Sequence, residues 1–156
     1  MQISIDACIS SMQLHSYLGI SKHGIASVLR SAGNADCHVI LRGGSNGPNY
    51  DQQYVADATT KTVKAMLLPC LLIDCSDRNS MKMLERQPEV AKDIGKQIFS
   101  GGGSAIKGVM IESNLVEGAQ KIVDGKAAVY GQSVTDACIW EATESTLDGI
   151  AKKVCV

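Results

Sequence analysis

The sequence lacks the features that would direct the chain to a membrane or to nucleic acid. Its 15 Lys and Arg nearly balance 16 Asp and Glu, and the net charge of -1 gives no general attraction to nucleic acid or to an anionic membrane. No apolar run approaches the roughly 18 residues of a membrane span. The N-terminal stretch MQISIDACISSM lacks the pattern of a signal peptide. We therefore expect a cytoplasmic protein with no nucleic-acid or membrane partner.

The sequence also lacks closely paired cysteines. No two are separated by only two residues, so the spacing supports neither a zinc knuckle nor a thioredoxin motif. Most lie in apolar segments, where a reduced cysteine packs as a small apolar side chain. A role as a metal ligand stays open, although spacing alone singles out none of the six: Cys8, Cys37, Cys70, Cys75, Cys138 and Cys155.

What the sequence contains is an alternation of apolar runs and helical patterns. The apolar runs predict strands at 37–41 (CHVIL), 67–73 (LLPCLLI) and 105–111 (AIKGVMI). The helical patterns lie at 2–12, 51–66, 88–99 and 144–154. Strands that are apolar almost throughout, with helices between them, are typical of a parallel sheet covered by helices. The 156 residues thus predict one α/β domain.

Spacing also predicts how the helices begin and which faces they bury. Asn49 and Gln52 are spaced as a capping box, and Pro88 suits a first helical turn. The expected apolar faces consist of Ile5, Ile9 and Met12; of Tyr54, Val55, Ala58 and Met66; of Val90, Ile94 and Ile98; and of Leu147, Ile150, Ala151 and Val154.

Each predicted strand ends in polar residues. Arg42 follows the first strand, with Gly43 and Gly44 beside it, the second ends in DCSDRNS, and Glu112 follows the third. The carboxyl ends of parallel strands meet at one edge, so these groups predict a site for phosphate and a metal. Backbone N–H groups of the two glycines and the guanidinium could approach the same anion. Taken singly, each residue also suits a surface charge, a helix cap or a turn.

A further carboxylate, Asp136, lies in a segment that we expect to fold back over this edge. Glu112 and Asp136 offer oxygen ligands that suit a divalent cation. Adding a His or Cys ligand would favour manganese, iron or zinc over magnesium.

Four stretches, in order and spacing, resemble one known family. They are GNADCHVILRGGSNGPNYD, IDCSDRNS, GVMIESNLVEG and YGQSVTDACIWE. The resemblance is to type I 3-deoxy-D-arabino-heptulosonate 7-phosphate (DAHP) synthase, C-terminal half only, and runs over nearly the whole chain. It implies a TIM-barrel fold and condensation of phosphoenolpyruvate with erythrose 4-phosphate in the shikimate pathway of aromatic amino acid biosynthesis. It also implies a divalent metal, Mn, Fe, Co or Zn.

Carried over by position, the resemblance implies roles for four residues. Arg42 matches the arginine that binds the phosphate of phosphoenolpyruvate. Glu112 and Asp136 match two metal ligands. Asp77 stands where the family has a ligand histidine, and we expect it to favour cations that prefer oxygen. The stretch CIWE also lacks a family glycine between Ile139 and Trp140, a change that could move Asp136 by about one residue's reach.

The family's N-terminal motifs, among them a cysteine ligand, have no counterpart here. We expect residues 1–156 to form the C-terminal part of the barrel domain, about the last three barrel strands with their helices. A (β/α)₈ barrel typically needs about 250 residues, so the open edges predict a homo-oligomer or a partner chain. Two functions follow: the family reaction, completed by another polypeptide, or a non-catalytic remnant or module that binds a complete synthase. A phosphate-binding or metal-binding module is a third reading.

Overall fold

The centre of the molecule is a parallel sheet of three strands. The computed structural model describes residues 1–154, although not the side chain of Val154. The sheet has the order β3 (Val39–Leu41), β4 (Leu71–Asp74) and β5 (Ile106–Met110), and both pairings are parallel. In register, Leu41 lies opposite Ile73, and Ile73 lies opposite Val109. The predicted α/β class with a parallel sheet is confirmed.

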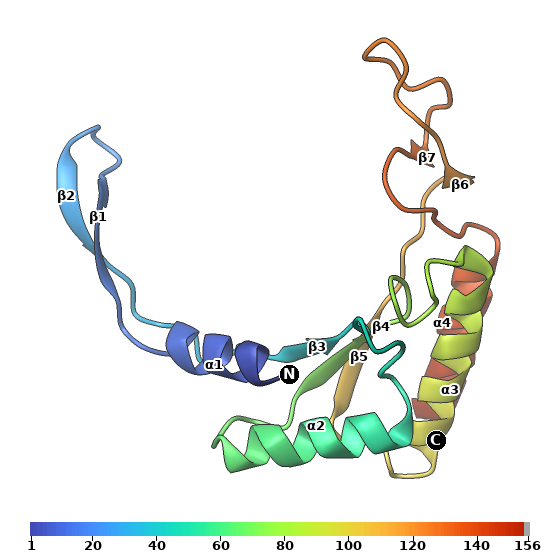
Figure 1. Cartoon of the computed structure of the whole chain (residues 1–156), viewed down its shortest axis with the longest axis horizontal. Helices are drawn as coiled ribbons and strands as arrows, with labels where there is room; N and C mark the ends of the chain where they lie inside the picture. The colour runs from blue at the N-terminus through green and yellow to red at the C-terminus, as the bar shows by residue number, and fades with distance from the viewer. Residues whose placement is uncertain (155–156) are drawn as a thin grey trace.

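Helices pack against this sheet and contribute to its core, and the side of the sheet away from α2 and the α3–α4 pair is open (Figure 1). They are α1 (Gln2–Ser11), α2 (Gln52–Lys64), α3 (Gln87–Phe99), which follows the short 3₁₀ helix η1 (Leu84–Arg86), and α4 (Ala142–Val154). Helix α4 packs along α3, while α2 lies apart from this pair (Figure 1). The buried core joins Leu71 and Ile73 of β4 to Val55 of α2 and Ile94 of α3. Apolar burial on this scale is the main force that holds sheet and helices together.

The predicted face of α3 is correct, with Ile98 partly buried against the core, whereas the predicted face of α2 is correct only for its central residues. Val55 and Ala58 are buried, and Val90 and Ile94 are buried on α3. Two expected members of the α2 face, Tyr54 and Met66, are exposed, and Thr62 is buried instead. Met66 lies beyond the helix in a left-handed conformation with φ 59°, so it does not continue the helical face.

The predicted faces of the terminal helices are only partly correct. Helix α1 buries Ile5 but leaves Ile9 and Met12 exposed. On α4, Ile150 packs against the core, whereas Leu147 is half exposed. Ala151 is exposed, and the side chain of Val154 lies outside the described residues.

The start of α2 corrects the predicted capping box. Asp51 is the N-cap, and its side chain accepts a hydrogen bond of 3.0 Å from the backbone N–H of Tyr54. Asn49 instead serves the loop after β3, as described below. Pro88 does occupy the first turn of α3, as predicted.

Two small sheets were not predicted. Strands β1 (Ser16–Ile20) and β2 (Ala26–Arg30) form an antiparallel hairpin that reaches away from the core, and β6 (Val116–Ala119) pairs in parallel with β7 (Gln132–Ser133) (Figure 1). The apolar residues of the hairpin, such as Leu18 and Val28, are mostly exposed. Strands without a buried face carry a weak alternation signal in the sequence.

The cysteines fit the expectation of reduced, mostly sheltered thiols. The five described cysteines are free; Cys8, Cys75 and Cys138 are buried, and Cys37 and Cys70 are partly buried. Burial raises the pKa of the Cys75 thiol to about 12, with a smaller contribution from Asp74, so this thiol stays protonated at neutral pH. Cys155 lies outside the described residues. Across residues 1–154, no helix combines the length and the apolarity that crossing a membrane requires.

Candidate functional site

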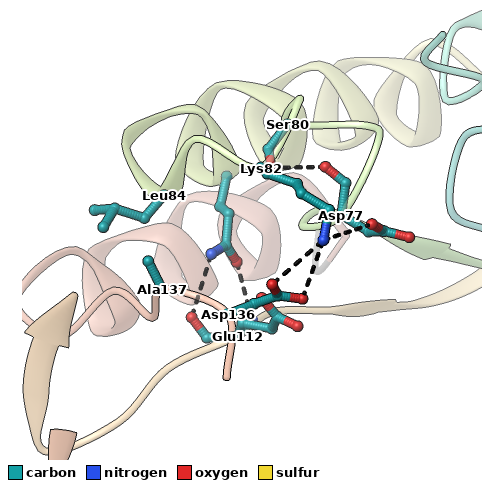
Figure 2. A pocket seen from close by; sticks show the side chains of 8 residues that line it. Asp77, Ser80, Lys82, Leu84, Glu112, Asp136 and Ala137 are labelled. Carbon is teal, nitrogen blue, oxygen red and sulfur yellow. Dashed lines mark hydrogen bonds and ion pairs between the residues drawn. The ribbon is translucent and has the colours of Figure 1, made fainter. Parts of the chain in front are cut away.

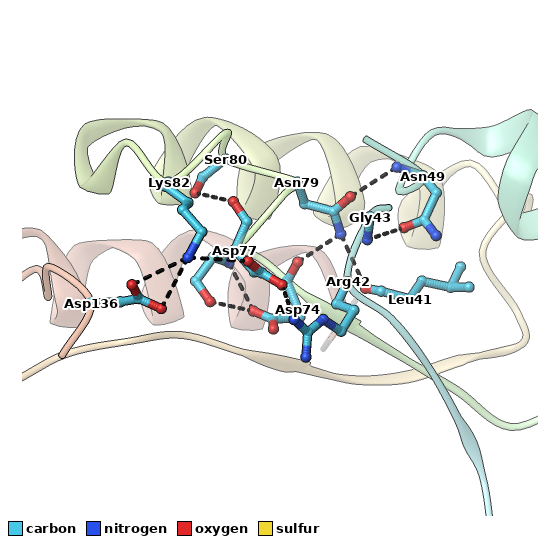
Figure 3. Close-up of polar contacts among 11 residues, drawn as sticks. Leu41, Arg42, Gly43, Asn49, Asp74, Asp77, Asn79, Ser80, Lys82 and Asp136 are labelled. Atoms are coloured by element: carbon cyan, nitrogen blue, oxygen red, sulfur yellow. Dashed lines mark hydrogen bonds and ion pairs between the residues drawn. The ribbon is translucent and has the colours of Figure 1, made fainter. Parts of the chain in front are cut away.

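The carboxyl ends of the central strands bring together the polar residues that the sequence predicted. Arg42 directly follows β3, Asp74 ends β4 with Asp77 in the loop after it, and Glu112 follows β5. Figure 3 shows Arg42 and Asp136 at this edge on either side of Asp77, which belongs to the loop after β4. Parallel pairing alone accounts for this convergence, because all three strands end on the same side.

Hydrogen bonds within the loop after β4 fix its start. Asp74 Oδ1 accepts hydrogen bonds from the backbone N–H of Ser76 at 2.9 Å and from Ser76 Oγ at 2.6 Å. This is an Asx-type turn, in which the side chain replaces a backbone acceptor. Asp74 therefore orients the loop.

Asn79 connects this loop to the neighbouring strand and loop (Figure 3). Its Nδ2 donates to the carbonyl of Leu41 at 3.0 Å and to that of Asp74 at 2.8 Å. Its Oδ1 accepts from the backbone N–H of Asn49 at 2.8 Å. Because the Asn79 side chain is buried, these bonds also satisfy its own polar atoms.

The loop after β3 does not offer free amides to an anion, contrary to the predicted role of its glycines. The N–H of Gly43 donates to Asn49 Oδ1 at 2.7 Å, and the N–H of Gly44 donates to the carbonyl of Gly47 at 3.0 Å. Gly43 has φ 79°, and a Cβ there would lie 2.5 Å from Arg78 Cβ. The glycine thus permits a close approach of two loops.

Asp77 is held between two cations. Its Oδ2 lies 2.5 Å from Arg42 Nη2 and its Oδ1 lies 3.7 Å from Lys82 Nζ. The contact with Arg42 is an ion pair without hydrogen-bond geometry. The Asp77 side chain is 12% exposed, against 67% for Arg42, so the arginine reaches in from solvent over the carboxylate.

Lys82 links Asp77 to Asp136, and the sequence did not predict this role. Its Nζ lies 3.3 Å and 3.4 Å from the two carboxylate oxygens of Asp136 (Figure 2). The direction of the side chain depends on a left-handed backbone at Met81 (φ 54°) and Lys82 (φ 62°). Non-glycine residues adopt this conformation rarely, and the MKM letters give no signal of it.

Gln87 was also missed by sequence reasoning, and it fixes the position of Glu112. Its Oε1 accepts from the backbone N–H of Glu112 at 2.9 Å, and its Nε2 donates to the carbonyl of Glu112 at 3.3 Å. The same carbonyl accepts from the N–H of Ile139 at 3.0 Å. Through this bond the segment with Asp136 returns to the end of β5, and half-exposed Trp140 follows directly.

Three other carboxylates lie close enough to Glu112 to influence its pKa. Burial raises the pKa of Glu112, and the charges of Asp136, Asp74 and Asp77 raise it further, while Lys82 opposes them. A small cavity of about 10 Å³ lies between these groups (Figure 2). Its lining consists of Asp77, Ser80, Lys82, Leu84, Gln87, Glu112, Asp136 and Ala137.

The arrangement does not fit a divalent metal as it stands. Asp77, Glu112 and Asp136 do converge, but the ammonium of Lys82 lies among them. Within residues 1–154, no group of three or more His, Cys, Asp and Glu side chains is placed to hold a metal ion. Lys82 of the same chain contacts Asp77 and Asp136, and Arg42 contacts Asp77.

Comparison with known proteins connects this edge to one family. The model of the DAHP synthetase I family matches residues 1–148. The phospho-2-dehydro-3-deoxyheptonate aldolase of Haemophilus influenzae is 41% identical over 155 residues, which are 99% of this chain and 42% of that protein. The Phe-sensitive enzyme of Escherichia coli is 42% identical, over 99% of this chain and 44% of its own length.

A solved structure gives the same result. The phospho-2-dehydro-3-deoxyheptonate aldolase of Francisella tularensis superimposes with a TM-score of 0.91 and 42% identity, over 99% of this chain and 45% of that one. The chain thus spans less than half the length of the relatives that it matches. The family match, the relatives and the shared backbone agree: the chain belongs to the DAHP synthetase I family.

Proposed function

We propose that this chain forms the C-terminal part of a DAHP synthase barrel, with β3, β4 and β5 as barrel strands. The completed barrel condenses phosphoenolpyruvate with erythrose 4-phosphate in the shikimate pathway. The observation that carries the proposal is the meeting of Arg42, Asp77 and Glu112 at the carboxyl edge of a parallel sheet, in a chain of this family. Active sites of such barrels lie at this edge.

Arg42 is the residue of this chain that binds substrate in the proposal. Its guanidinium is mostly exposed and matches a phosphate in charge and geometry, so it binds the phosphate of phosphoenolpyruvate and orients that substrate. Asp77 holds the same guanidinium at 2.5 Å, so a bound phosphate competes with that carboxylate.

In the proposal, the barrel strands that residues 1–156 do not supply complete the catalytic site. Strands β3 and β5 are the outer strands of the central sheet, and each has a partner on one side only. Unpaired strand edges favour pairing with a further chain. We propose either a homo-oligomer or a partner chain that carries the other barrel strands, and we expect the isolated chain to be inactive.

The resemblance implies a divalent metal, Mn, Fe, Co or Zn, held by Glu112, Asp136 and Asp77. Because the Lys82 ammonium lies among these groups, no step assigned to this chain runs through a metal.

The alternative is a non-catalytic remnant, or a module that binds a complete synthase. The observation that favours it is Asp77 in the position of the family's ligand histidine, with both of its oxygens already paired to cations. A carboxylate in this state satisfies Arg42 in place of a substrate phosphate.

A complementation assay separates the two functions. The chain is assayed for consumption of phosphoenolpyruvate with erythrose 4-phosphate and Mn²⁺, alone and mixed with an N-terminal fragment of a relative such as the Escherichia coli enzyme. Turnover in the mixture, lost on Arg42→Ala and kept on the control Arg30→Ala in the hairpin, supports the proposed reaction. Inactivity in both settings, with a folded chain, supports the remnant.

A further inference from the structure

The cluster of carboxylates at the strand ends already contains a cation, and that cation belongs to the protein. We propose that the Lys82 ammonium is the resident cation of the carboxylate cluster, defined as Asp77, Glu112 and Asp136, and that it excludes divalent metals until it is removed. The inference does not rest on the proposed condensation, because its readout is metal binding alone.

Distances support this role. Lys82 Nζ lies 3.3 Å and 3.4 Å from the oxygens of Asp136 and 3.7 Å from Asp77 Oδ1 (Figure 2). Divalent cations in oxygen sites lie about 2.0–2.6 Å from their ligands. A metal that bound both aspartates would therefore meet the ammonium at close range, where their like charges repel each other.

The backbone is shaped to place this lysine. Asp77, Met81 and Lys82 all have positive φ values, of 41°, 54° and 62°. The N–H of Lys82 also donates to the carbonyl of Asp77 at 2.7 Å, which closes the loop between the two ends of the ion pair. Three left-handed non-glycine residues in six positions are costly, and such strain concentrates where geometry serves a function.

The charge balance points the same way. Arg42 pairs with one oxygen of Asp77, and Lys82 pairs with the other and with Asp136. Among the ion pairs of residues 1–154, none includes Glu112. A divalent metal that used all three carboxylates would have to break the ion pairs of both aspartates. Glu112 is the one member of the cluster that a metal could bind without breaking one of these ion pairs.

The test is a titration of the whole chain with Mn²⁺. The electron paramagnetic resonance signal of free Mn²⁺ is the readout. Wild type is compared with Lys82→Met, which keeps the aliphatic stem and removes the charge. The matched control is Lys61→Met, which removes a lysine paired at 2.7 Å to Asp57 on the surface of α2. We expect a Kd weaker than about 1 mM for wild type and for Lys61→Met, and binding at least about tenfold tighter for Lys82→Met.

Several results would overturn the proposal. Mn²⁺ binding by wild type with a Kd as tight as that of Lys82→Met would show that the ammonium excludes nothing. Lys82→Met could also be folded by circular dichroism and bind Mn²⁺ no more tightly than wild type. This result would show that the carboxylate cluster does not hold a metal. An equal gain in Mn²⁺ affinity for Lys61→Met would show that the effect comes from the change in net charge and not from the position of Lys82.

Two further measurements decide the case if Lys82→Met does not fold. Lys82→Arg keeps the charge, so we expect it to remain as weak a Mn²⁺ binder as wild type, and tighter binding would refute the role of the charge. Wild type should also melt at the same temperature in Mn²⁺ as in EDTA. A higher melting temperature in Mn²⁺ would mean that the folded chain binds the metal with the lysine in place.

Discussion

Gln87 pairs with the backbone of Glu112 as a neighbouring strand would. Its side-chain amide accepts from the Glu112 N–H at 2.9 Å and donates to the Glu112 carbonyl at 3.3 Å. Gln87 stands at the start of α3 and is 1% exposed. One side chain thus fixes the end of β5, from which Glu112 projects, to the helix that covers the sheet.

Replacing Gln87 by leucine should destabilise the chain. The change leaves the backbone N–H of Glu112 without its partner at a part-buried site, a loss of about 1–3 kcal/mol. Urea unfolding measures the free energy of unfolding. Gln53→Leu on the exposed surface of α2 is the matched control and should change it by less than about 0.5 kcal/mol. Equal effects of the two changes would contradict the pairing role of Gln87.

Gly43 should not tolerate a side chain. At φ 79° an added Cβ lies 2.5 Å from Arg78 Cβ and 2.9 Å from the Arg78 carbonyl carbon, so Gly43→Ala forces the loops after β3 and β4 apart. We expect a loss of about 2 kcal/mol or more, seen as a lower melting temperature.

Gly44 is the matched control for this substitution. It has no atom within 4 Å of an added Cβ and no positive φ, so Gly44→Ala should leave the melting temperature nearly unchanged. A larger fall in melting temperature for Gly44→Ala than for Gly43→Ala would contradict the requirement for a close approach of the two loops.

The raised pKa of Glu112 should appear in the pH dependence of stability. Burial and the nearby carboxylates raise this pKa above 4.5, so the folded chain holds the proton at pH values where the unfolded chain has lost it. Stability therefore falls as pH rises from about 4.5 through the folded pKa, and then levels off.

Glu112→Gln should remove this part of the slope and raise the free energy of unfolding at neutral pH relative to wild type. Urea unfolding between pH 4 and 8 measures it. Glu117→Gln, at an exposed position outside the cavity, should keep the slope of wild type. A Glu112→Gln curve that runs parallel to wild type at every pH would contradict the assignment.

The sequence predicted the strands and the polar edge because both follow from short-range patterns. The apolar runs matched β3, β4 and β5, and parallel pairing then placed Arg42, Asp77 and Glu112 together. The roles of Lys82 and Gln87 were not predictable in this way. Lys82 depends on left-handed backbone angles, and Gln87 acts on a residue that lies 25 positions away.

The errors share a physical cause. The distance from Asn49 to Gln52 predicts a helix cap, but the Asn49 side-chain oxygen accepts from Gly43 and its backbone N–H donates to Asn79, and these two partners lie in different loops. The β1–β2 hairpin escaped prediction because its apolar side chains are not buried against the core. Local patterns identify elements whose conformation depends on nearby residues. They fail where a segment distant in the sequence decides the conformation.

Trp140 gives the chain a built-in optical reporter. It is the only tryptophan of the sequence and stands half exposed, four residues after Asp136 and directly after Ile139, whose N–H bonds to Glu112. Its emission therefore follows the detachment of this segment from β5, whereas circular dichroism follows the loss of the helices. If the two signals change at different denaturant concentrations, the strand-end cluster opens before the core melts.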